Sequence, residues 1–272
     1  MAHEHADRAR AALITGASSG IGRCYAEQLA RRGYTPVLVA RRADRLAALA
    51  ESVRRETGLE ATVLAADLAD PDGLARVERA VLDHDSLAVV VNAAGLGALG
   101  PLRDAASEDL DRLVAVNVLA LTRLSRAALL AFDRQGSGTL INVSSIGAFH
   151  APPGGTAYAA SKAYDLHFSR ALQREVEGSG IRVQVVLPGP VRTEFFEASG
   201  VDSSLFPQES FVDAGDLVRA ALAGLDMGEL VCIPTLPDMT AWEDEAARGQ
   251  ALRNAAGLRG VISDRYARPD QH

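Results

Sequence analysis

The sequence predicts an α/β fold, a doubly wound and mostly parallel sheet of about seven strands with helices on both faces. Short apolar runs alternate with amphipathic segments from residue 11 to residue 233. Alternation at this spacing is typical of β–α–β units with right-handed crossovers. Runs such as LAVVV and VQVVL are apolar on both faces, which indicates parallel strands that helices cover from both sides. Such a sheet has the architecture of a Rossmann fold.

Seven apolar runs are the strand candidates, and a helix candidate follows each of the first six. We expect the strands at 11–15, 35–40, 61–65, 87–91, 138–144, 182–187 and 230–233. We expect the helices near 20–32, 43–57, 72–83, 107–133, 157–178 and 213–226.

Neither an internal repeat nor a linker interrupts this alternation, so we expect one domain over residues 1–272. Two regions lie outside the alternation. Residues 194–212 are inserted between the sixth strand and its helix, at the carboxyl edge where open α/β sheets bind ligands. We therefore expect 194–212 to form a lid over the site and 234–272 to form a polar C-terminal tail.

Composition and charge exclude several classes of function. The net charge of −7 argues against a nucleic-acid surface. The polar first ten residues do not resemble a signal peptide, and no stretch approaches the ~20 uninterrupted apolar residues of a membrane span. Cys24 and Cys232 form no metal-type pattern, so we expect no metal site. We expect a cytoplasmic protein that binds neither nucleic acid nor membrane.

The first strand leads into a glycine-rich turn, TGASSGIG at 15–22, and then into a helix. The first glycine permits the tight turn, the second lets the backbone approach a pyrophosphate, and the third lets the helix pack on the strand. The helix N-terminus offers N–H groups and the positive end of its dipole to phosphates. A glycine turn without a ligand is the alternative. The cofactor-binding residues expected here are Gly16, Ser18, Ser19, Gly20, Ile21 and Gly22.

The end of the second strand favours NADP(H) over NAD(H). An NAD site places a carboxylate there for the ribose 2′-hydroxyl, whereas an NADP site places arginine. This chain has Arg41 and Arg42, and its first acidic residue is Asp44. Arg41 can bind a 2′-phosphate in a bidentate manner, and Ser19 can add a hydroxyl donor. Alternatively, both arginines are solvated residues at the start of a helix.

Two further strand ends are candidates for contacts with the cofactor. Asp67 and Leu68 follow the third strand, where the carboxylate can face the adenine amino group. The fourth strand is followed by small residues where backbone must pass close to the cofactor. These are Asn92, Ala93, Ala94 and Gly95.

Lys162 is the only lysine of the chain, whose other basic residues are all arginine, and it follows Tyr158 by four positions. A site that keeps lysine in such a background needs a compact ammonium with three rotatable donors. Residues i and i+4 share one face of a helix, so the ammonium would stabilise a tyrosinate. The pair predicts a tunable proton donor; an exposed helix pair is the alternative.

These motifs together resemble the single-domain short-chain dehydrogenase/reductases. TGASSGIG at 15–22, NAAG at 92–95, Asn117, Ser145, YAASK at 158–162 and PGPVRT at 188–193 match the motifs of that family in order. The resemblance covers residues 11–193, with looser similarity to residue 233. It implies a reductase or dehydrogenase that moves hydride between a nicotinamide and a carbonyl or alcohol.

The resemblance also implies a role for each matching residue. Tyr158 is the expected general acid. Ser145 is the expected serine that hydrogen-bonds the substrate carbonyl, and its neighbour Ser144 is the alternative candidate for that role. Lys162 is expected to hold the nicotinamide ribose, and Asn117 to kink its helix and join a proton relay to Lys162. The residues expected to flank the nicotinamide are Pro188, Gly189, Val191 and Thr193, with Thr193 bonding its carboxamide.

The substrate is expected to be an apolar ketone or alcohol, because phenylalanines concentrate in the lid. They are Phe195, Phe196, Phe206 and Phe211, with Leu205 beside them. A core within the lid or a subunit contact would explain them equally well. The resemblance implies a homodimer or homotetramer formed through helices 107–133 and 157–178. Two other functions remain open: a non-catalytic NADPH-sensing protein, and a nucleotide-sugar epimerase or dehydratase, which the short C-terminal part disfavours.

Overall fold

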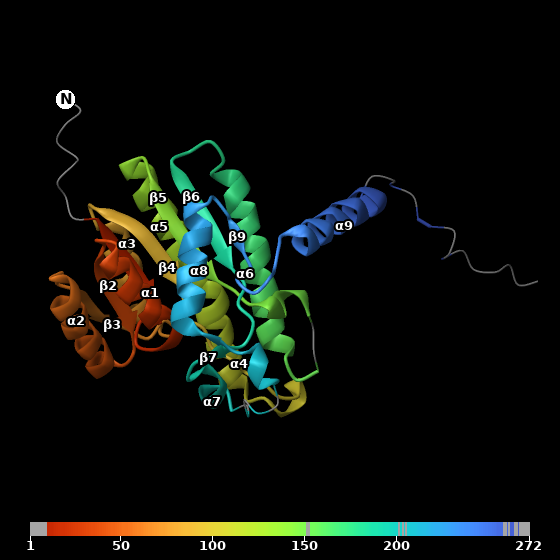
Figure 1. Ribbon diagram of the computed structural model, residues 1–272. Coiled ribbons are helices and arrows are strands. Elements are labelled where there is room, and N and C mark those ends of the chain that lie inside the picture. Colours follow the sequence, from red (N-terminus) through yellow and green to blue (C-terminus); the bar gives the residue numbers. More distant parts are fainter. Residues whose placement is uncertain are drawn as a thin grey trace, which may run out of the picture. The chain divides into compact units, whose positions relative to one another are not determined.

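The computed structural model describes residues 10–150, 153–200, 202, 204, 206–257, 260, 262–263 and 266. In this part of the chain seven parallel strands form one sheet in the order β3-β2-β1-β4-β5-β6-β9 (Figure 1). Their bounds are β1 Ala11–Thr15, β2 Thr35–Ala40, β3 Thr62–Ala65, β4 Leu87–Asn92, β5 Gly138–Val143, β6 Ile181–Val186 and β9 Val231–Cys232. The predicted doubly wound sheet is confirmed, and its order reverses between β1 and β4.

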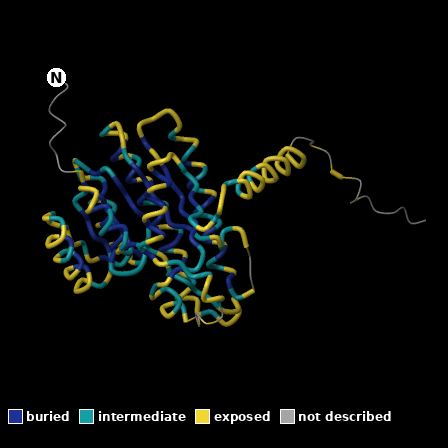
Figure 2. The backbone as a smooth tube through the Cα atoms, in the orientation of Figure 1, coloured by how far each residue is buried: buried dark blue, intermediate teal, exposed yellow. Residues whose placement is uncertain are grey.

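Helices cover both faces of the sheet, as the apolar strands require. One face carries α1 Gly20–Arg31, α2 Ala43–Thr57 and α8 Ala214–Asp226, whose buried residues join one core cluster. The other face carries α3 Pro71–Leu82, α5 Leu121–Gln135 and α6 Thr156–Glu175. In Figure 2 the central strands are buried between helices whose outer faces are exposed, whereas the edge strand β3 is mostly exposed.

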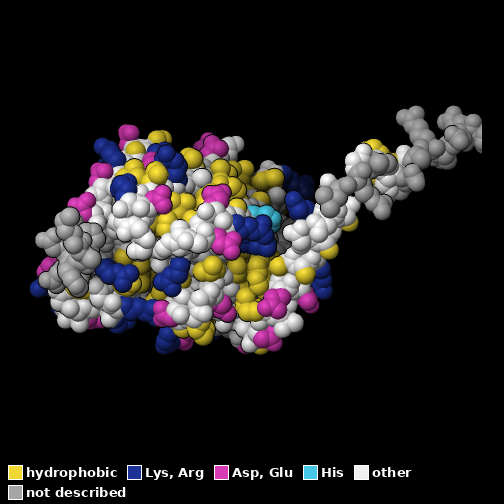
Figure 3. Space-filling view, turned by 90° about the horizontal axis from the view of Figure 1, so that it is seen from above, with side chains coloured by type: hydrophobic (Ala, Val, Ile, Leu, Met, Phe, Trp, Pro, Cys, Tyr) yellow, Lys and Arg dark blue, Asp and Glu magenta, His cyan; other side chains and the backbone are white. Residues whose placement is uncertain are grey.

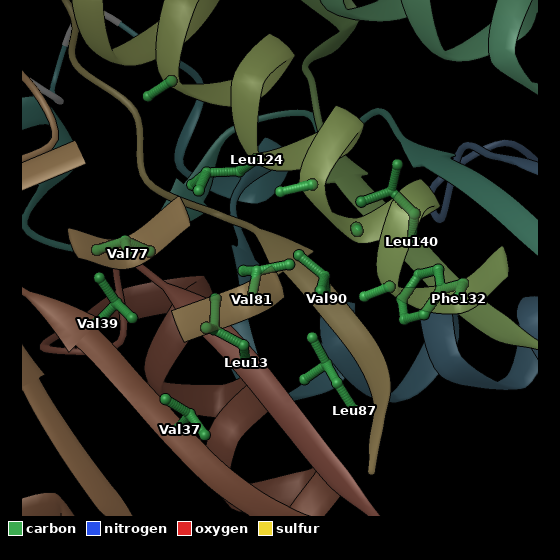
Figure 4. Packing of buried hydrophobic residues seen from close by; sticks show 14 of the residues in the cluster. Leu13, Val37, Val39, Val77, Val81, Leu87, Val90, Leu124, Phe132 and Leu140 are labelled. Atoms are coloured by element: carbon green, nitrogen blue, oxygen red, sulfur yellow. The ribbon is translucent and has the colours of Figure 1, made fainter. Parts of the chain in front are cut away.

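The core between the sheet and helices α3, α5 and α6 is built from hydrophobic side chains of both layers. Strand residues such as Leu13, Val90 and Leu140 point toward Val81 of α3 and Phe132 of α5 (Figure 4). All five have exposed fractions of 0%. Each buried side chain of this size contributes about 1.5–3 kcal/mol relative to an exposed one. This core fixes the strand ends from which the site is built.

The predicted helix at 107–133 is a composite. It comprises α4 Ser107–Val114, a π-helical segment Ala115–Ala120 and α5, in one continuous run. Asn117 lies inside the π segment, where the resemblance implies a kink. By length and composition the run Ser107–Gln135 would pass as a membrane span, and 50% of its most apolar window is buried. Core helices of sheet-based proteins have the same properties, and this run contacts β4 and β5.

A pair of two-residue strands, which the sequence pattern does not predict, joins the two ends of the lid. Strands β7 Val191–Arg192 and β8 Val212–Asp213 pair in parallel, with Val191 opposite Val212. Between them lies the short helix α7 Phe195–Ala198. The predicted lid therefore begins and ends at adjacent points of the structure. Residues 201, 203 and 205 of the lid lie outside the described residues. The last of them is Leu205, which we expected beside the lid phenylalanines.

Contacts divide the chain into two compact units, Met1–Pro234 and Thr235–His272. The second unit, expected as a polar tail, contains α9 Thr240–Gly257, which has no buried residue. The sequence pattern misses α9 because a helix that is polar all round has no apolar period. That residues 1–272 form one domain stays a prediction.

On the face of the molecule seen in Figure 3, basic and acidic side chains are interspersed among hydrophobic ones.

Candidate active site

A cavity of about 530 Å³ opens at the carboxyl ends of the strands, and the turns after β1 to β6 all contribute to its lining. It extends from the glycine turn, past the ends of β4 and β5, to the lid. Most of the predicted site residues meet there. The lining includes Gly16, Ser18, Ser19, Gly20, Ile21, Gly22, Arg41, Arg42, Asp67, Leu68, Ala93, Ala94, Gly95, Ser145, Tyr158, Lys162, Pro188, Gly189, Val191 and Thr193. Asn92 and Asn117 lie behind this lining.

The glycines of the turn after β1 are fixed by close approaches. Gly16 has φ +69°, and a Cβ there would lie 2.9 Å from the backbone nitrogen of Ala94. A Cβ on Gly22 would lie 2.4 Å from the carbonyl oxygen of Gly16, so the helix packs directly on the turn. A Cβ on Gly20 would lie 2.9 Å from Cγ2 of Thr193. The turn thus keeps an uncovered backbone beside the N-terminus of α1, which fits a pyrophosphate.

Thr15, at the end of β1, connects the glycine turn to the loop after β4. Its hydroxyl donates to the carbonyl of Val91 over 3.2 Å and accepts from the backbone N–H groups of Ala93 and Ala94, each over 3.1 Å. These bonds set the distance between the two strand ends on either side of the switch point. Thr15 was not among the predicted site residues, although its place before Gly16 could have suggested it.

Arg42 is the centre of a polar cluster at the end of the cavity where the sequence predicts a 2′-phosphate. Its guanidinium donates to Ser18 Oγ over 3.0 Å and to Ser19 Oγ over 2.8 Å. Its Nη1 also lies 2.8 Å from Oε2 of Glu194, the first residue of the lid. Arg45 of α2 pairs with the same carboxylate, Nη1 to Oε1 2.6 Å. Hydrogen bonds from Arg42 and Arg45 lower the pKa of Glu194.

Asp67 binds protein groups with both of its carboxylate oxygens. Oδ1 accepts from the N–H of Ala69 over 2.9 Å, and Oδ2 accepts from Arg112 of α4 over 2.9 Å. Burial acts to raise the pKa of Asp67, but these two hydrogen bonds outweigh it and the pKa is lowered. Asp67 therefore ties α4 to the end of β3 while it lines the cavity.

Tyr158 and Lys162 lie one turn apart on α6, as predicted, with Nζ 5.9 Å from the centre of the phenol ring. Ser145 faces the same point in the cavity. A Cβ added to Gly147 would lie 3.3 Å from Ser145 Oγ and 3.6 Å from Cε1 of Tyr158. Gly147 therefore keeps the space between these two side chains open, and sequence patterns did not single it out.

The two adjacent serines at the end of β5 have different environments. Ser144 is buried, and its hydroxyl donates to the carbonyl of Lys162 over 2.9 Å. Ser145 accepts from the N–H of Gly147 over 3.0 Å and donates to the carbonyl of Pro188 over a long 3.5 Å. Its proton is thus weakly held beside the cavity. This geometry favours Ser145 over Ser144 as the donor to a substrate carbonyl.

Lys162 has a buried anionic partner that the sequence reasoning missed. Its ammonium lies 3.0 Å from Oδ2 of Asp165, and their side chains are 6% and 0% exposed. Burial opposes the ammonium, but the carboxylate outweighs it and the pKa of Lys162 is raised. Burial also raises the pKa of Asp165, which the lysine offsets only in part. The i,i+3 spacing on a predicted helix could have indicated this pair.

Asn117 connects the π segment to the loop after β4. Its side-chain oxygen accepts from the N–H of Leu96 over 2.8 Å, and its amide donates to the carbonyl of Leu96 over 2.9 Å and to Ser161 Oγ over 3.0 Å. A Cβ on Gly95 would lie 3.7 Å from both Asn117 Oδ1 and Lys162 Nζ, so both polar groups border one point. Asn117 thus holds the wall next to Lys162.

Asn92 takes part in an interior polar network and not in the cavity wall. Its amide donates to Asn142 Oδ1 over 2.9 Å and to Ser125 Oγ over 3.2 Å. Asn142 in turn donates to Ser169 of α6 over 2.9 Å. This network joins β4 and β5 to helices α5 and α6. Its effect on the site is to hold the strand ends in register.

The phenylalanines of the lid divide into two groups. The ring of Phe195 lies 5.5 Å from the ring of Tyr158, centre to centre. Phe196, Phe206 and Phe211 pack on one another with centre distances of 5.1–6.3 Å. Phe211 does not line the cavity, whereas the other three do. The lid therefore has a core of its own and also presents aromatic rings to the site.

The arrangement combines a cradle for a dinucleotide with a proton donor. The glycine turn offers backbone N–H groups, the arginines offer cations, and Tyr158 with Ser145 offers O–H donors directed at one point of an aromatic-lined cavity. A dinucleotide fits this donor set, because backbone N–H groups at a helix N-terminus and arginine side chains bind phosphates, and both line the cavity. Such a site can polarise a carbonyl oxygen and protonate it.

Comparison with known proteins identifies the family. The short chain dehydrogenase family model matches residues 10–203. A short-chain dehydrogenase from Sphingobium yanoikuyae, solved in complex with NADPH, is 39% identical with a TM-score of 0.90, and the match covers 94% of this chain and 99% of that one. The bulky-bulky ketone specific alcohol dehydrogenase from Comamonas testosteroni is 37% identical with a TM-score of 0.86 over 95% and 99%.

A curated relative is more distant in sequence. The very-long-chain 3-oxoacyl-CoA reductase of Anas platyrhynchos is 31% identical over 229 residues, which are 82% of this chain and 72% of the relative. Two further relatives, 38% and 31% identical, are covered over 60% and 58% of their lengths. With its fold, its motifs and the family model in agreement, the chain belongs to the short-chain dehydrogenase/reductases, oxidoreductases that act on CH–OH and C=O groups with a nicotinamide dinucleotide.

Proposed function

We propose that the chain is an NADPH-dependent carbonyl reductase, or alcohol dehydrogenase in the reverse direction, that acts on apolar ketones or alcohols. The observation that carries the proposal is the cavity in which Tyr158, beside Lys162, faces both the glycine turn and the aromatic lid. An NADPH-sensing protein without catalysis would need the turn and the arginines, but not a tyrosine, a lysine and a serine around one point.

In the proposed reaction the protein handles the proton and the orientation. When bound, the cofactor supplies the hydride. Ser145 Oγ donates a hydrogen bond to the carbonyl oxygen, and Tyr158 Oη transfers its proton to the same oxygen as charge develops there. In the reverse direction the tyrosinate accepts the alcohol proton. A positioned acid of this kind contributes roughly 10²–10⁴-fold, and Lys162 stabilises the anion that the tyrosine leaves.

Two arginines and the absence of a carboxylate at the end of β2 support NADPH over NADH. Arg41 and Arg42 both line the cavity, and Arg42 already holds the two serines of the glycine turn. A 2′-phosphate there would receive charge-assisted hydrogen bonds. The relative from Sphingobium yanoikuyae in complex with NADPH is consistent with this choice.

The apolar character of the proposed substrate follows from the aromatic side of the cavity. Phe195, Phe196 and Phe206 line it together with Leu96 and Leu99. The name of the relative from Comamonas testosteroni refers to ketones with two bulky substituents, and that of the relative from Anas platyrhynchos to a long acyl chain. A long acyl chain is apolar but the coenzyme A that carries it is highly charged, so we propose the bulky ketone as the first class to examine.

The test is NADPH consumption, with NADH in parallel, across a panel of ketones, aldehydes and β-keto esters. Wild type is compared with Tyr158→Phe, which keeps the ring against Phe195 but removes the proton. We expect turnover with NADPH that the substitution lowers by at least about 10²-fold. Tight NADPH binding without turnover on any carbonyl would favour the sensor and contradict the reductase.

We also propose that the protein forms a homodimer or homotetramer through the long helices. Val114, Leu119 and Leu130 on the run 107–135 are 52%, 49% and 40% exposed, and exposed aliphatic side chains that gather on one surface mark a site of protein–protein contact. Light scattering after size exclusion measures the mass of the particle in solution. A monomer at micromolar concentration would contradict the proposal, and Leu119→Asp should dissociate the oligomer.

A further inference from the structure

Asp165 is a buried charge that the reaction outlined above does not use. It lies on α6, three residues after Lys162, with an exposed fraction of 0%. Its Oδ2 pairs with the lysine over 3.0 Å, while its Oδ1 has no hydrogen-bond partner among the described residues. Burial of a carboxylate is unfavourable, and a hydrophobic side chain of similar size is often at least as stable there. Stability alone therefore does not account for an aspartate at this position.

The bonds of Lys162 give Asp165 a direct effect on the cavity. An ammonium has three N–H donors. Two of them are used inside the protein, one toward the carbonyl of Val143 over 3.0 Å and one toward Asp165. One donor remains for the cavity, which Lys162 lines. The carboxylate thus fixes both the position of the ammonium and the direction in which its last N–H group points.

Asp165 also sets the charge around the proton donor. Among the described residues, Asp165 and Tyr158 are the titratable groups that act on Lys162, and both lie on α6. The groups that border it from other elements, Val143 and Ser144 at the end of β5 and Asn117 in the π segment, are neutral. The Tyr158–Lys162 pair therefore experiences one neighbouring anion, and that anion favours retention of the protons of the pair.

We propose that Asp165 is a positioning residue for the carbonyl reduction proposed above: it holds Lys162 at the cavity wall and keeps the Tyr158–Lys162 pair protonated to higher pH. The inference rests on the proposed function for its kinetic consequence. The charge effect itself is a property of the protein without substrate. Removal of the anion makes the first proton easier to lose, whichever of the two groups loses it.

The test compares wild type with Asp165→Asn, whose amide oxygen can still accept from Lys162 but carries no charge. In the reduction direction we expect the alkaline limb of kcat/KM to move to lower pH by about one unit, a tenfold change in proton affinity. Independently of any substrate, tyrosine ionisation is followed by absorbance near 295 nm. The signal of Tyr158 is the difference between each protein and its Tyr158→Phe counterpart, and it should move in the same direction.

A second variant and a control separate charge from folding. Asp165→Val fills the buried site without a charge or an acceptor, so it should shift the alkaline limb of the kcat/KM profile to lower pH as Asp165→Asn does. It should also weaken NADPH binding, because Lys162 is no longer held. Ser169→Ala, one turn further along α6, removes a buried partner of Asn142 and should lower the melting temperature without moving the limb. If Asp165→Asn and Asp165→Val leave both the limb and the absorbance titration in place, the proposal is wrong, even where stability falls. A protein that reduces no carbonyl but shows the absorbance shift would contradict the proposed function and support the role of Asp165.

Discussion

At the scale of single residues, the adjacent serines Ser144 and Ser145 differ in what their hydroxyl groups contact. One bonds the backbone of a helix, and the other faces the cavity. Successive side chains of an extended segment point to opposite sides. Ser144 therefore bonds the backbone of α6, while Ser145 faces the cavity beside Gly147. The sequence could propose either serine, because both follow the same apolar strand. Only the direction of each hydroxyl distinguishes a support for the helix from a donor to substrate.

This difference predicts opposite effects for two alanine substitutions. Ser145→Ala should lower kcat for the best ketone by roughly 10²–10³-fold, the usual effect of removing a donor to a developing oxyanion. Its stability should fall by no more than about 1 kcal/mol, because the bond to Pro188 is long and the other loss is the hydrogen bond from the N–H of Gly147. Ser144→Ala should lower stability by about 0.5–1.5 kcal/mol, because it removes a buried hydrogen bond between the end of β5 and α6. Kinetics and thermal melting of both variants check the pair, and a larger loss of kcat in Ser144→Ala would reverse the assignment.

Gly20 allows a second residue-scale prediction with an internal control. Gly20→Ala would place a methyl group 2.9 Å from Cγ2 of Thr193, in the turn expected to bind the pyrophosphate. Gly58→Ala introduces similar strain at φ +75°, but nothing lies within 4 Å of it. Both should lose about 1 kcal/mol of stability. Only Gly20→Ala should weaken NADPH binding, by tenfold or more, as measured by fluorescence titration. Equal affinities in the two variants would argue against the cofactor role of the turn.

At the scale of elements, the regular α/β units could be predicted because each has a hydrophobic period of its own. Strands such as β4 are buried on both faces, and helices such as α3 bury one stripe of apolar side chains. Both patterns can therefore be recognised from the order of apolar residues in the sequence. The π segment, β7 and β8 lack such a pattern. A π turn differs from an α turn by one residue, and strands of two residues are too short for alternation. Their formation depends on tertiary contacts such as those of Asn117 with Leu96.

The link between the lid and α2 is an element-scale feature with a consequence for the cofactor. Glu194 belongs to the lid, and its two guanidinium partners lie at the start of α2, Arg42 as the residue before the helix and Arg45 in its first turn. A 2′-phosphate that binds Arg42 would compete with this carboxylate and be repelled by it. The same carboxylate would not repel a ribose 2′-hydroxyl, for which a carboxylate is a suitable acceptor. Glu194 should therefore reduce the preference for NADPH.

We predict that Glu194→Gln tightens NADPH binding by about three- to tenfold, the size expected for one or two exposed ion pairs. NADH affinity should stay within about twofold, and the gain should shrink at high salt because exposed charges are screened. Glu197→Gln, which removes an exposed charge of α7 outside this cluster, is the matched control. Fluorescence titrations with both cofactors measure the effect. Weaker NADPH binding in Glu194→Gln would mean that the carboxylate supports the arginines and does not compete with phosphate.

At the scale of the whole molecule, the position of the site follows from topology. Parallel strands bring their carboxyl ends to one edge, so motifs spread from residue 15 to residue 193 could be predicted to meet. The ion pairs that join the lid to α2 could not be predicted this way. Arg45 and Glu194 are 149 residues apart, and no local pattern relates them. Asp165 was within reach of sequence reasoning, but a charged residue on a helix is usually solvated, and only its burial distinguishes it.

The division into two units leads to a prediction about the C-terminal part. The described residues that line the cavity lie between Gly16 and Phe206, and α9 has no buried residue. A chain that ends at Pro234 should therefore keep its melting temperature within about 2 °C and its kcat within about twofold, because removal of exposed surface changes stability by roughly 0.5 kcal/mol or less. A chain that ends at Met227 loses β9 with the buried Cys232 and should be strongly destabilised. Thermal melting and NADPH consumption distinguish the two truncations. Lost turnover in the chain that ends at Pro234, with its melting temperature intact, would instead mean that residues 235–272 contribute to the site in the assembled protein.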